Sequence, residues 1–357
     1  MARLIIHIGP GKCGSSTIQD FFQSKNDPCI EKTGFVLLHP KLVAKLNRES
    51  PRKERLLELR ELIDSAIANK DVLILSHEFL FQCPFSIRNI CRLIQDEVSD
   101  IRIIGYSRRQ SGFMASSYAQ WLFRSPDRVQ EVCEILERAE INTDVFSGLE
   151  RHFIASILDE FNSARQMSNH LILDWNRSYK AIQDIIWSAK ARVVCGLLPM
   201  KGEGESLIQD FCDKAELKLK DSSEKGLRSI RNKSFDPSLV EQINKALLGG
   251  AKVPGPHSNN KSLYILSSLT GAGSFEESAF MASLKSYVDA YFQESNIKLC
   301  ETYGLDASYF HEEQAITKSE IMNIVRNEMK RRKTEGILEP KRSLLTSVYL
   351  KLYGVFN

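Results

Sequence analysis

Short apolar runs alternate with amphipathic segments through the first 125 residues of the chain. Runs that are apolar at almost every position are typical of strands buried on both faces of a sheet. The runs are Leu4–Ile8, Gly34–Pro40, Val72–Ser76 and Ile101–Tyr106. Between and after them, apolar residues recur at helical spacing, in 15–22, 52–70, 85–98 and 112–123. Strands alternating with helices predict an α/β fold of three layers, with a central parallel sheet flanked by helices.

The remaining chain is less regular but continues the same alternation. We expect a strand start at Leu171–Asp174 and a further strand at Arg192–Leu198. Helices are predicted for much of 127–165 and for 205–216, 237–248 and 279–303. We interpret residues 1–310 as one α/β domain with helical insertions at about 40–70 and 120–190, and residues 311–357 as a helical C-terminal extension. The basic run Lys330–Lys333 is predicted to be a solvated face of that extension.

Composition narrows the class of protein. Of 357 residues, 43% are hydrophobic and 26% charged, which excludes disorder, collagen and coiled coil as the main state. The 48 Lys and Arg exceed the 45 Asp and Glu by only +3, so no nucleic-acid partner is expected. No run of about 20 apolar residues predicts a membrane span. The opening apolar stretch is too short for the apolar core of a signal peptide, so we expect a cytoplasmic location. The eight cysteines form no CxxC pair, and in such a location we expect them to be reduced thiols.

A glycine-rich loop, Gly9–Gly14 (GPGKCG), joins the first predicted strand to a predicted helix. A helix N-terminus offers unpaired N–H groups and partial positive charge, and glycines let the backbone wrap an anion. Lys12 adds a full charge, and Ser15–Thr17 add hydroxyl donors. The loop therefore predicts a phosphate or phosphosulfate site. It is not the GxxxxGK[ST] loop of nucleoside triphosphatases, because its lysine precedes the last glycine.

The segment Gly9–Thr17 (GPGKCGSST) resembles the 5′-phosphosulfate loop of sulfotransferases that use 3′-phosphoadenosine 5′-phosphosulfate (PAPS). That loop usually reads KTGTT, so Cys13 and the two serines are conservative departures. The resemblance implies a P-loop-like fold and a lysine, Lys12, that assists departure of the leaving group. It assigns donor binding to Gly11, Lys12, Cys13, Gly14, Ser15, Ser16 and Thr17.

A second element of the resemblance follows the strand Ile101–Tyr106. The family's 3′-phosphate site has an arginine after a strand and a serine eight residues later, which matches Arg108 and Ser116. An arginine fork can hold a terminal phosphate through two bonds. Arg109 and Ser117 are neighbouring alternatives, but the spacing favours Arg108 and Ser116.

The candidate base follows the strand Val72–Ser76. Many glycan and bacterial sulfotransferases that resemble this chain carry a glutamate at this strand end, which implies that Glu78 takes the acceptor proton. His77 is the second candidate because histidine titrates near neutrality. A helix N-cap role for Ser76 or Glu78 is the structural alternative.

Other features complete the predicted site and its surroundings. In the basic loop 220–234, Arg231 and Lys233 resemble residues that close over the nucleotide in bacterial members of the family.

We expect no metal site, because the histidines lack ligand spacing and His7 suits a core position. Trp175 is expected to be a packing residue, as are the other two tryptophans. The apolar end, Ser343–Asn357, is expected to dock on protein, with a second subunit or a membrane surface as alternatives.

Taken with the resemblance, the sequence predicts a PAPS-dependent sulfotransferase that releases adenosine 3′,5′-bisphosphate (PAP) and needs no metal. The resemblance favours a saccharide or lipid-linked saccharide as acceptor, through a hydroxyl or amine; peripheral membrane contact and a homo-oligomer stay open. Two rivals remain: a P-loop kinase or nucleoside triphosphatase, and a non-catalytic nucleotide- or glycan-binding protein of the same fold.

Overall fold

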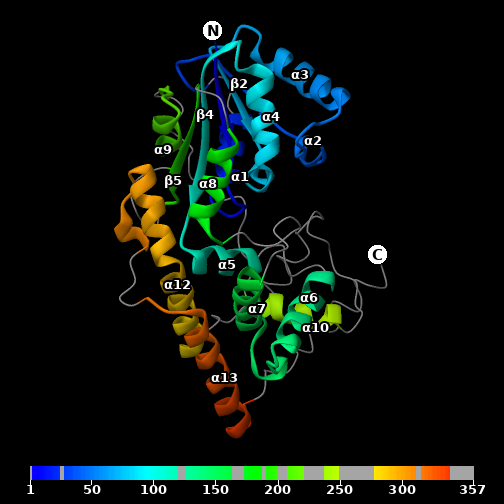
Figure 1. Ribbon diagram of the computed structural model, residues 1–357, viewed down its shortest axis with the longest axis vertical. Coiled ribbons are helices and arrows are strands. Elements are labelled where there is room, and N and C mark those ends of the chain that lie inside the picture. The colour runs from blue at the N-terminus through cyan, green and yellow to red at the C-terminus, as the bar shows by residue number, and fades with distance from the viewer. Residues whose placement is uncertain are drawn as a thin grey trace. The chain divides into compact units, whose positions relative to one another are not determined.

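A computed structural model places five strands in one parallel sheet flanked by helices (Figure 1). It describes residues 2–24, 28–119, 126–162, 173–186, 190–199, 207–220, 237–248, 277–310 and 315–337. The described chain forms two compact units. The first comprises residues 1–108, 174–232 and 295–309, and the second 109–173, 233–294 and 310–357. The predicted boundary near residue 310 stays a prediction.

The sheet belongs to the first unit, and its strand order is β2-β3-β1-β4-β5. The strands are β1 Ala2–His7, β2 Thr33–Leu37, β3 Val72–Ser76, β4 Val98–Ser107 and β5 Ala191–Leu197. All four neighbouring pairs are parallel. The apolar runs formed strands because both faces are covered: every residue of β3 is buried, as are the last four of β1. The predicted α/β fold with a central parallel sheet is confirmed.

Helices of the first unit follow the amphipathic segments closely. They are α1 Ser15–Ser24, α2 Pro40–Leu46, α3 Lys53–Ile67, the short 3-10 helices η1 Glu78–Gln82 and η5 Ala307–Phe310, α4 Pro84–Ile94, α8 Trp175–Ile185 and α9 Leu207–Lys214. In α1 the buried face consists of Ser15, Ile18, Phe21 and Phe22. One prediction is wrong: Leu173 and Asp174 do not continue a strand, because the Asp174 side chain caps α8 by accepting the N–H of Arg177 at 2.9 Å. Residues 171 and 172 of that prediction lie outside the described residues.

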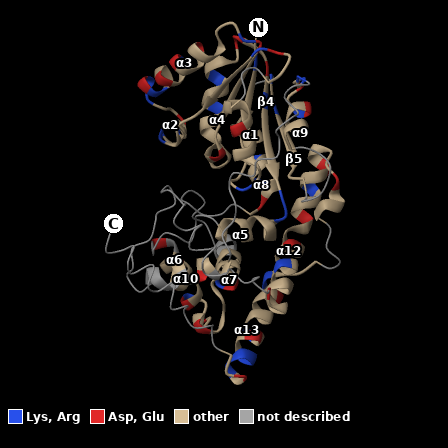
Figure 2. Cartoon of the chain, turned by 180° about the vertical axis from the view of Figure 1, so that it is seen from behind, with Lys and Arg blue, Asp and Glu red and all other residues tan. Residues whose placement is uncertain are grey.

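The second unit is helical where it is described. It contains α5 Gln110–Tyr118, α6 Pro126–Arg138, η3 Thr143–Val145, α7 Gly148–Asn162, α10 Pro237–Leu248 and α13 Lys318–Thr334. The long helix α12, Ala279–Tyr303, belongs to this unit up to residue 294. Lys and Arg gather in the last turn of α13 (Figure 2).

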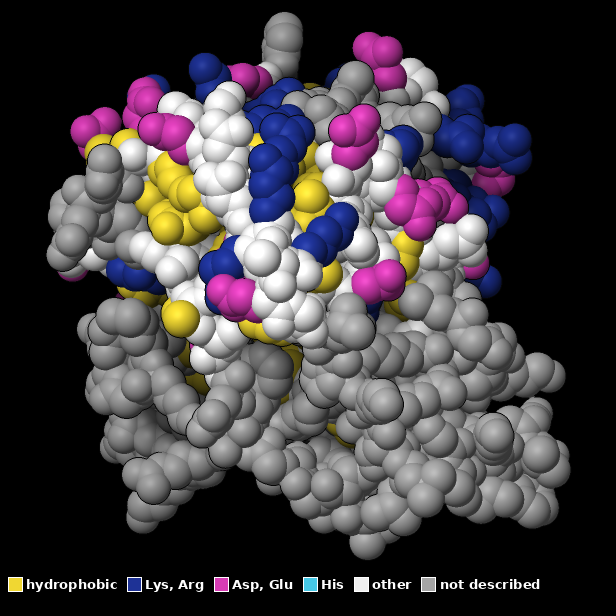
Figure 3. Space-filling model, turned by 90° about the horizontal axis from the view of Figure 1, so that it is seen from below, with side chains coloured by type: hydrophobic (Ala, Val, Ile, Leu, Met, Phe, Trp, Pro, Cys, Tyr) yellow, Lys and Arg dark blue, Asp and Glu magenta, His cyan; other side chains and the backbone are white. Residues whose placement is uncertain are grey.

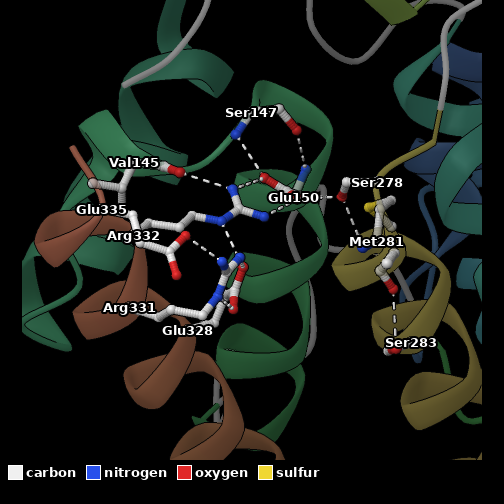
Figure 4. A network of polar contacts seen from close by, with 11 residues as sticks. Val145, Ser147, Glu150, Ser278, Met281, Ser283, Glu328, Arg331, Arg332 and Glu335 are labelled. Carbon is white, nitrogen blue, oxygen red and sulfur yellow. Dashed lines mark hydrogen bonds and ion pairs between the residues drawn. The ribbon is translucent and has the colours of Figure 1, made fainter. Parts of the chain in front are cut away.

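The last turn of α13 is solvated at Lys330, Arg331 and Lys333, as its basic composition predicts, but the prediction is wrong for Arg332. Arg332 is buried and donates two bonds to the Glu150 carboxylate, at 2.8 and 2.9 Å, and one to the Val145 carbonyl oxygen at 2.8 Å (Figure 4). Its guanidinium also lies 5.2 Å from the ring centres of Phe146 and Phe280. Because Glu150 belongs to α7, this ion pair joins α13 to α7. The side chain of the neighbouring Arg331 is half exposed.

The surface carries charges of both signs. On the face shown in Figure 3, Lys and Arg side chains lie among Asp and Glu and small apolar areas. In the described part of the chain, no helix is both long and apolar enough to cross a bilayer.

Candidate active site

The order of the strands in the sheet indicates where a ligand would bind. From β1 the chain passes to β2 at one edge of the sheet, and from β4 it goes on toward β5 at the other edge. β1 and β4 are direct neighbours, with His7 opposite Ile104. Ligands of open parallel sheets bind outside the carboxyl ends of strands where the connections diverge in this way. The loops after β1 and β4 are therefore the expected site, and they are the loops that contain Lys12 and Arg108.

The loop after β1 bends tightly against the end of β4. Gly9 lies so close to it that an added Cβ would come within 3.4 Å of the Tyr106 backbone nitrogen. Gly14 has φ +86°, and an added Cβ would clash with the Leu207 side chain, so any other residue would be strained there. Lys12 itself adopts φ 74°, an unusual conformation for a residue with a side chain. Such residues cluster at ligand sites, where the surrounding structure compensates their cost.

The helix N-terminus after this loop carries an unsatisfied polar group. Ser15 is 2% exposed, and its Oγ has no hydrogen-bond partner among the described residues. This oxygen would lie 3.9 Å from a Cβ on Gly9, so it is turned toward the loop. A buried hydroxyl without a partner is costly. A ligand oxygen at the α1 N-terminus would remove that cost and would also meet the positive end of the helix dipole.

Arg108 reaches from the end of β4 to the loop after β1. Its Nη1 donates a hydrogen bond to the Lys12 carbonyl oxygen at 3.2 Å, across 96 residues of sequence. Both side chains are half-buried. The two basic residues predicted to hold opposite ends of the donor are therefore adjacent in the first unit.

Cys13 contributes differently from its neighbours in the loop. Its side chain is 1% exposed, and burial raises the pKa of the thiol to about 12, so the group is neutral. Its backbone N–H donates to the Pro10 carbonyl oxygen at 3.3 Å and so closes the turn. Cys13 helps to shape the loop from inside the core.

Glu78 begins η1, directly after β3. The residue is accessible to solvent, yet protein atoms crowd its carboxyl group and raise its pKa, while the positive charge of Lys12 lowers it. The interaction shows that the carboxyl group lies within electrostatic range of Lys12. A carboxyl group with a raised pKa beside a cationic loop is a candidate general base.

His77 serves as the N-cap of η1, the role proposed for Ser76 or Glu78 from sequence. Its Nδ1 accepts the backbone N–H of Phe79 at 2.9 Å. Burial, and then the nearby His39, lower the pKa of His77. The neutral ring therefore carries its hydrogen on Nε2, and its only lone pair is already engaged.

Ser76 is held from two sides beneath these residues. Its Oγ lies 2.8 Å from Nδ1 of His7 and accepts a bond from Nε2 of Gln19 at 3.2 Å. His7 is 1% exposed, and burial lowers its pKa to about 3, as expected of a core histidine. His7 and Ser76 are buried and Gln19 is half-buried, and their contacts join β1, β3 and α1.

The other candidates at the end of β4 lie in the second unit. Ser116 is half-buried on α5, and its role beside Arg108 stays a prediction. Arg109 approaches Asp289 of α12 to 3.9 Å. The Ser117 hydroxyl is buried and donates to the Met114 carbonyl oxygen at 2.8 Å. Arg109 and Ser117 therefore both contact residues of the second unit.

Arg231 and Lys233 lie outside the described residues, as do Trp121, Trp187 and the segment Ser343–Asn357. Among the residues that the structure describes, no three His, Cys, Asp or Glu side chains gather into a group that could hold a metal ion.

Sequence reasoning missed one residue that touches the site. Trp175 is buried as expected, but its indole Nε1 also donates to the Arg108 carbonyl oxygen at 2.7 Å. Its sequence neighbourhood shows no sign of this bond, because 67 residues separate the partners.

Comparison with known proteins adds little to this geometry. No protein-family model matches the chain, and no curated protein matches it. Among solved structures, a sulfotransferase from Alicyclobacillus acidocaldarius is similar over 86% of this chain and 98% of its own, with 15% identity and a TM-score of 0.38. A likeness at this level is too low to support an inference about activity, so the function has to be argued from the chain's own residues.

Proposed function

We propose that this chain is a sulfotransferase that moves a sulfuryl group from PAPS to an acceptor hydroxyl or amine. The observation that carries the proposal is the hydrogen bond from Arg108 to the Lys12 carbonyl oxygen, at 3.2 Å. This bond joins Arg108, which follows the end of β4, to the loop that contains Lys12, and it supports the proposal that this loop binds an anion with a second cation next to it. A nucleotide with phosphate at both its 5′ and 3′ positions has the charge to use both.

The loop after β1 suits the 5′-phosphosulfate. The unpartnered Ser15 hydroxyl and the α1 N-terminus offer donors to phosphate oxygens, and Lys12 supplies a full charge. In the proposed reaction, the acceptor oxygen or nitrogen forms a bond to sulfur as the bond from sulfur to the 5′-phosphate oxygen breaks. Lys12 stabilises the negative charge that builds on the departing phosphate.

Arg108 is proposed to bind the 3′-phosphate. Its guanidinium donates to Lys12 through Nη1, and its other N–H groups can meet a phosphate. This contact would select a 3′-phosphorylated nucleotide over AMP or ATP.

Glu78 is the proposed general base. Crowding around its carboxyl group raises its pKa and so its basicity, and the positive charge of Lys12 opposes that rise and favours the ionised form. It takes the proton of the acceptor hydroxyl or amine as the new bond to sulfur forms, so that no positive charge is left on the attacking oxygen or nitrogen.

We retain a saccharide or lipid-linked saccharide as the acceptor class from the family resemblance. The chemistry common to that class is a hydroxyl that loses its proton to Glu78 in the transfer.

The donor can be tested before any acceptor is known. In a thermal-shift titration, PAP should raise the melting temperature of the full chain without added metal, and AMP should raise it far less. Stabilisation by ATP with magnesium but not by PAP would favour the kinase or triphosphatase. If PAP binds, transfer of ³⁵S from labelled PAPS to a panel of saccharides and glycolipids separates an enzyme from a non-catalytic binding protein.

A further inference from the structure

Trp175 is the first residue of α8 and is fully buried, with its indole N–H directed at the backbone of Arg108. We propose that Trp175 is a positioning residue for the donor site. By fixing the Arg108 main chain, it aims the Arg108 guanidinium at the 3′-phosphate and so sets the preference for a 3′-phosphorylated nucleotide. The inference rests on the proposed function.

Arg108 needs such support because it lies just beyond the sheet. The Ser107 carbonyl oxygen still accepts the N–H of Leu198, at 2.8 Å, after the end of β5. One residue later the Arg108 carbonyl oxygen accepts the Trp175 indole N–H instead, at 2.7 Å. Trp175 thus provides the bond that the next strand no longer provides.

The two ends of Arg108 are held by different elements. Its carbonyl oxygen is bound by α8 through Trp175, and its guanidinium is bound by the anion loop through the Lys12 carbonyl oxygen. A long side chain attached to a mobile backbone loses conformational freedom when it binds a ligand. Fixing the backbone in advance reduces that loss, which favours phosphate binding.

Trp175 is itself immobilised. The preceding Asp174 caps α8 and also accepts the Ser295 hydroxyl at 2.6 Å. The indole ring meets Phe81 of η1 edge-on, with 6.1 Å between ring centres. An indole held this firmly can direct its single N–H at one acceptor.

A purely structural role would have a different signature. Loss of packing around Trp175 lowers the melting temperature and weakens every nucleotide to a similar extent. Loss of the N–H alone should weaken only ligands that contact Arg108 through a 3′-phosphate. The ratio of the dissociation constants for AMP and PAP therefore separates the two roles.

The experiment titrates the full chain with PAP and with AMP by calorimetry, for the wild type and for Trp175→Phe. Losing one part-buried hydrogen bond to the Arg108 carbonyl oxygen should weaken PAP binding by about 3- to 10-fold, and AMP binding should change by less than about twofold. Replacing Trp175 with benzothienylalanine exchanges the N–H for sulfur at nearly constant shape and should give the same result if Trp175→Phe folds poorly. Phe81→Leu is the packing control: it should lower the melting temperature and leave the ratio unchanged.

Each outcome decides a different point. If wild-type protein binds PAP no better than AMP, both the proposed function and this inference fail. If the wild type prefers PAP and both changes at Trp175 preserve the preference, the proposed function stands and the positioning role is overturned. The positioning role is also overturned if Phe81→Leu shifts the ratio as much as Trp175→Phe does.

Discussion

The ring of His77 accepts the backbone N–H of Phe79 through Nδ1, at 2.9 Å, and this bond starts the short helix whose first residue is Glu78. The bond separates the two candidate bases. His77 could gain a proton only by giving up its cap, and burial already lowers its pKa. Glu78 is accessible to solvent as a residue, and crowding of its carboxyl group by protein atoms raises the pKa of that group.

Glu78→Gln should lower kcat by roughly 10²-fold or more, because a positioned base contributes about that much. The base must be ionised, so wild-type kcat should fall as the pH drops through the raised pKa of Glu78. That acidic decline should begin above the ordinary carboxyl range and be absent in Glu78→Gln. The check is a pH–rate profile with the first acceptor that shows turnover. Glu54→Gln, on the exposed face of α3, serves as the control. Wild-type turnover in Glu78→Gln would remove Glu78 from the mechanism.

The cap predicts different behaviour for two substitutions of His77. Asparagine is a good N-cap and does not titrate, so His77→Asn should keep kcat within about threefold of wild type and preserve the acidic decline. His77→Ala removes the cap, at a local cost of about 1 kcal/mol, and should reduce kcat further by displacing Glu78. Both are measured with the same pH–rate profiles. If His77→Asn abolishes turnover while His77→Ala does no more, the imidazole acts chemically.

Lys12→Ala should cut turnover by roughly 10²-fold or more, the scale of losing one donor to developing charge. PAP should also bind more weakly, because the loop loses its full positive charge. Lys53→Ala removes an exposed lysine at the start of α3 and should change neither quantity. Single-turnover rates and PAP titrations on both variants check this. Near-normal turnover in Lys12→Ala would refute the role of Lys12 in departure of the leaving group.

Local signals in the sequence were enough to locate the two loops of the candidate site. A continuous apolar run predicts a strand from local sequence alone, and glycines after the run predict a tight turn. The loop Gly9–Gly14 could therefore be located directly, and so could the polar residues after the apolar run of β4. The parallel arrangement then brought both loops to one edge of the sheet.

Contacts between distant residues could not be predicted in this way. The Lys330–Lys333 run has the composition of a solvated face, and only Glu150, 182 residues away, makes Arg332 a buried residue. The apolar run before Asp174 predicts a strand that includes it, because its capping role depends on a helix that begins only after it. The Nδ1 bond of His77 depends on a side-chain rotamer, which sequence spacing does not determine.

The Arg332–Glu150 pair should matter for stability far more than its neighbours on α13. Arg332→Met leaves the Glu150 carboxylate buried without its charge partner, which should lower the free energy of unfolding by about 3–5 kcal/mol. Arg331→Met alters the same helix turn at a half-exposed position and should change stability little. Urea unfolding followed by circular dichroism compares the two. Equal effects of Arg331→Met and Arg332→Met would contradict the burial of the pair.

His7 should make the protein sensitive to acid. Burial lowers its pKa from 6.5 to about 3, so between these pH values the unfolded chain binds a proton that the native protein excludes. The free energy of unfolding therefore falls as the pH drops below about 6.5, by up to ~1.4 kcal/mol per pH unit. Other groups titrate in the same range, so the test compares variants: between pH 7 and pH 5, His7→Asn should lose about 2 kcal/mol less than wild type in urea unfolding. An equal acid loss in His7→Asn and wild type would mean that His7 is protonated in the native protein or is reached by water.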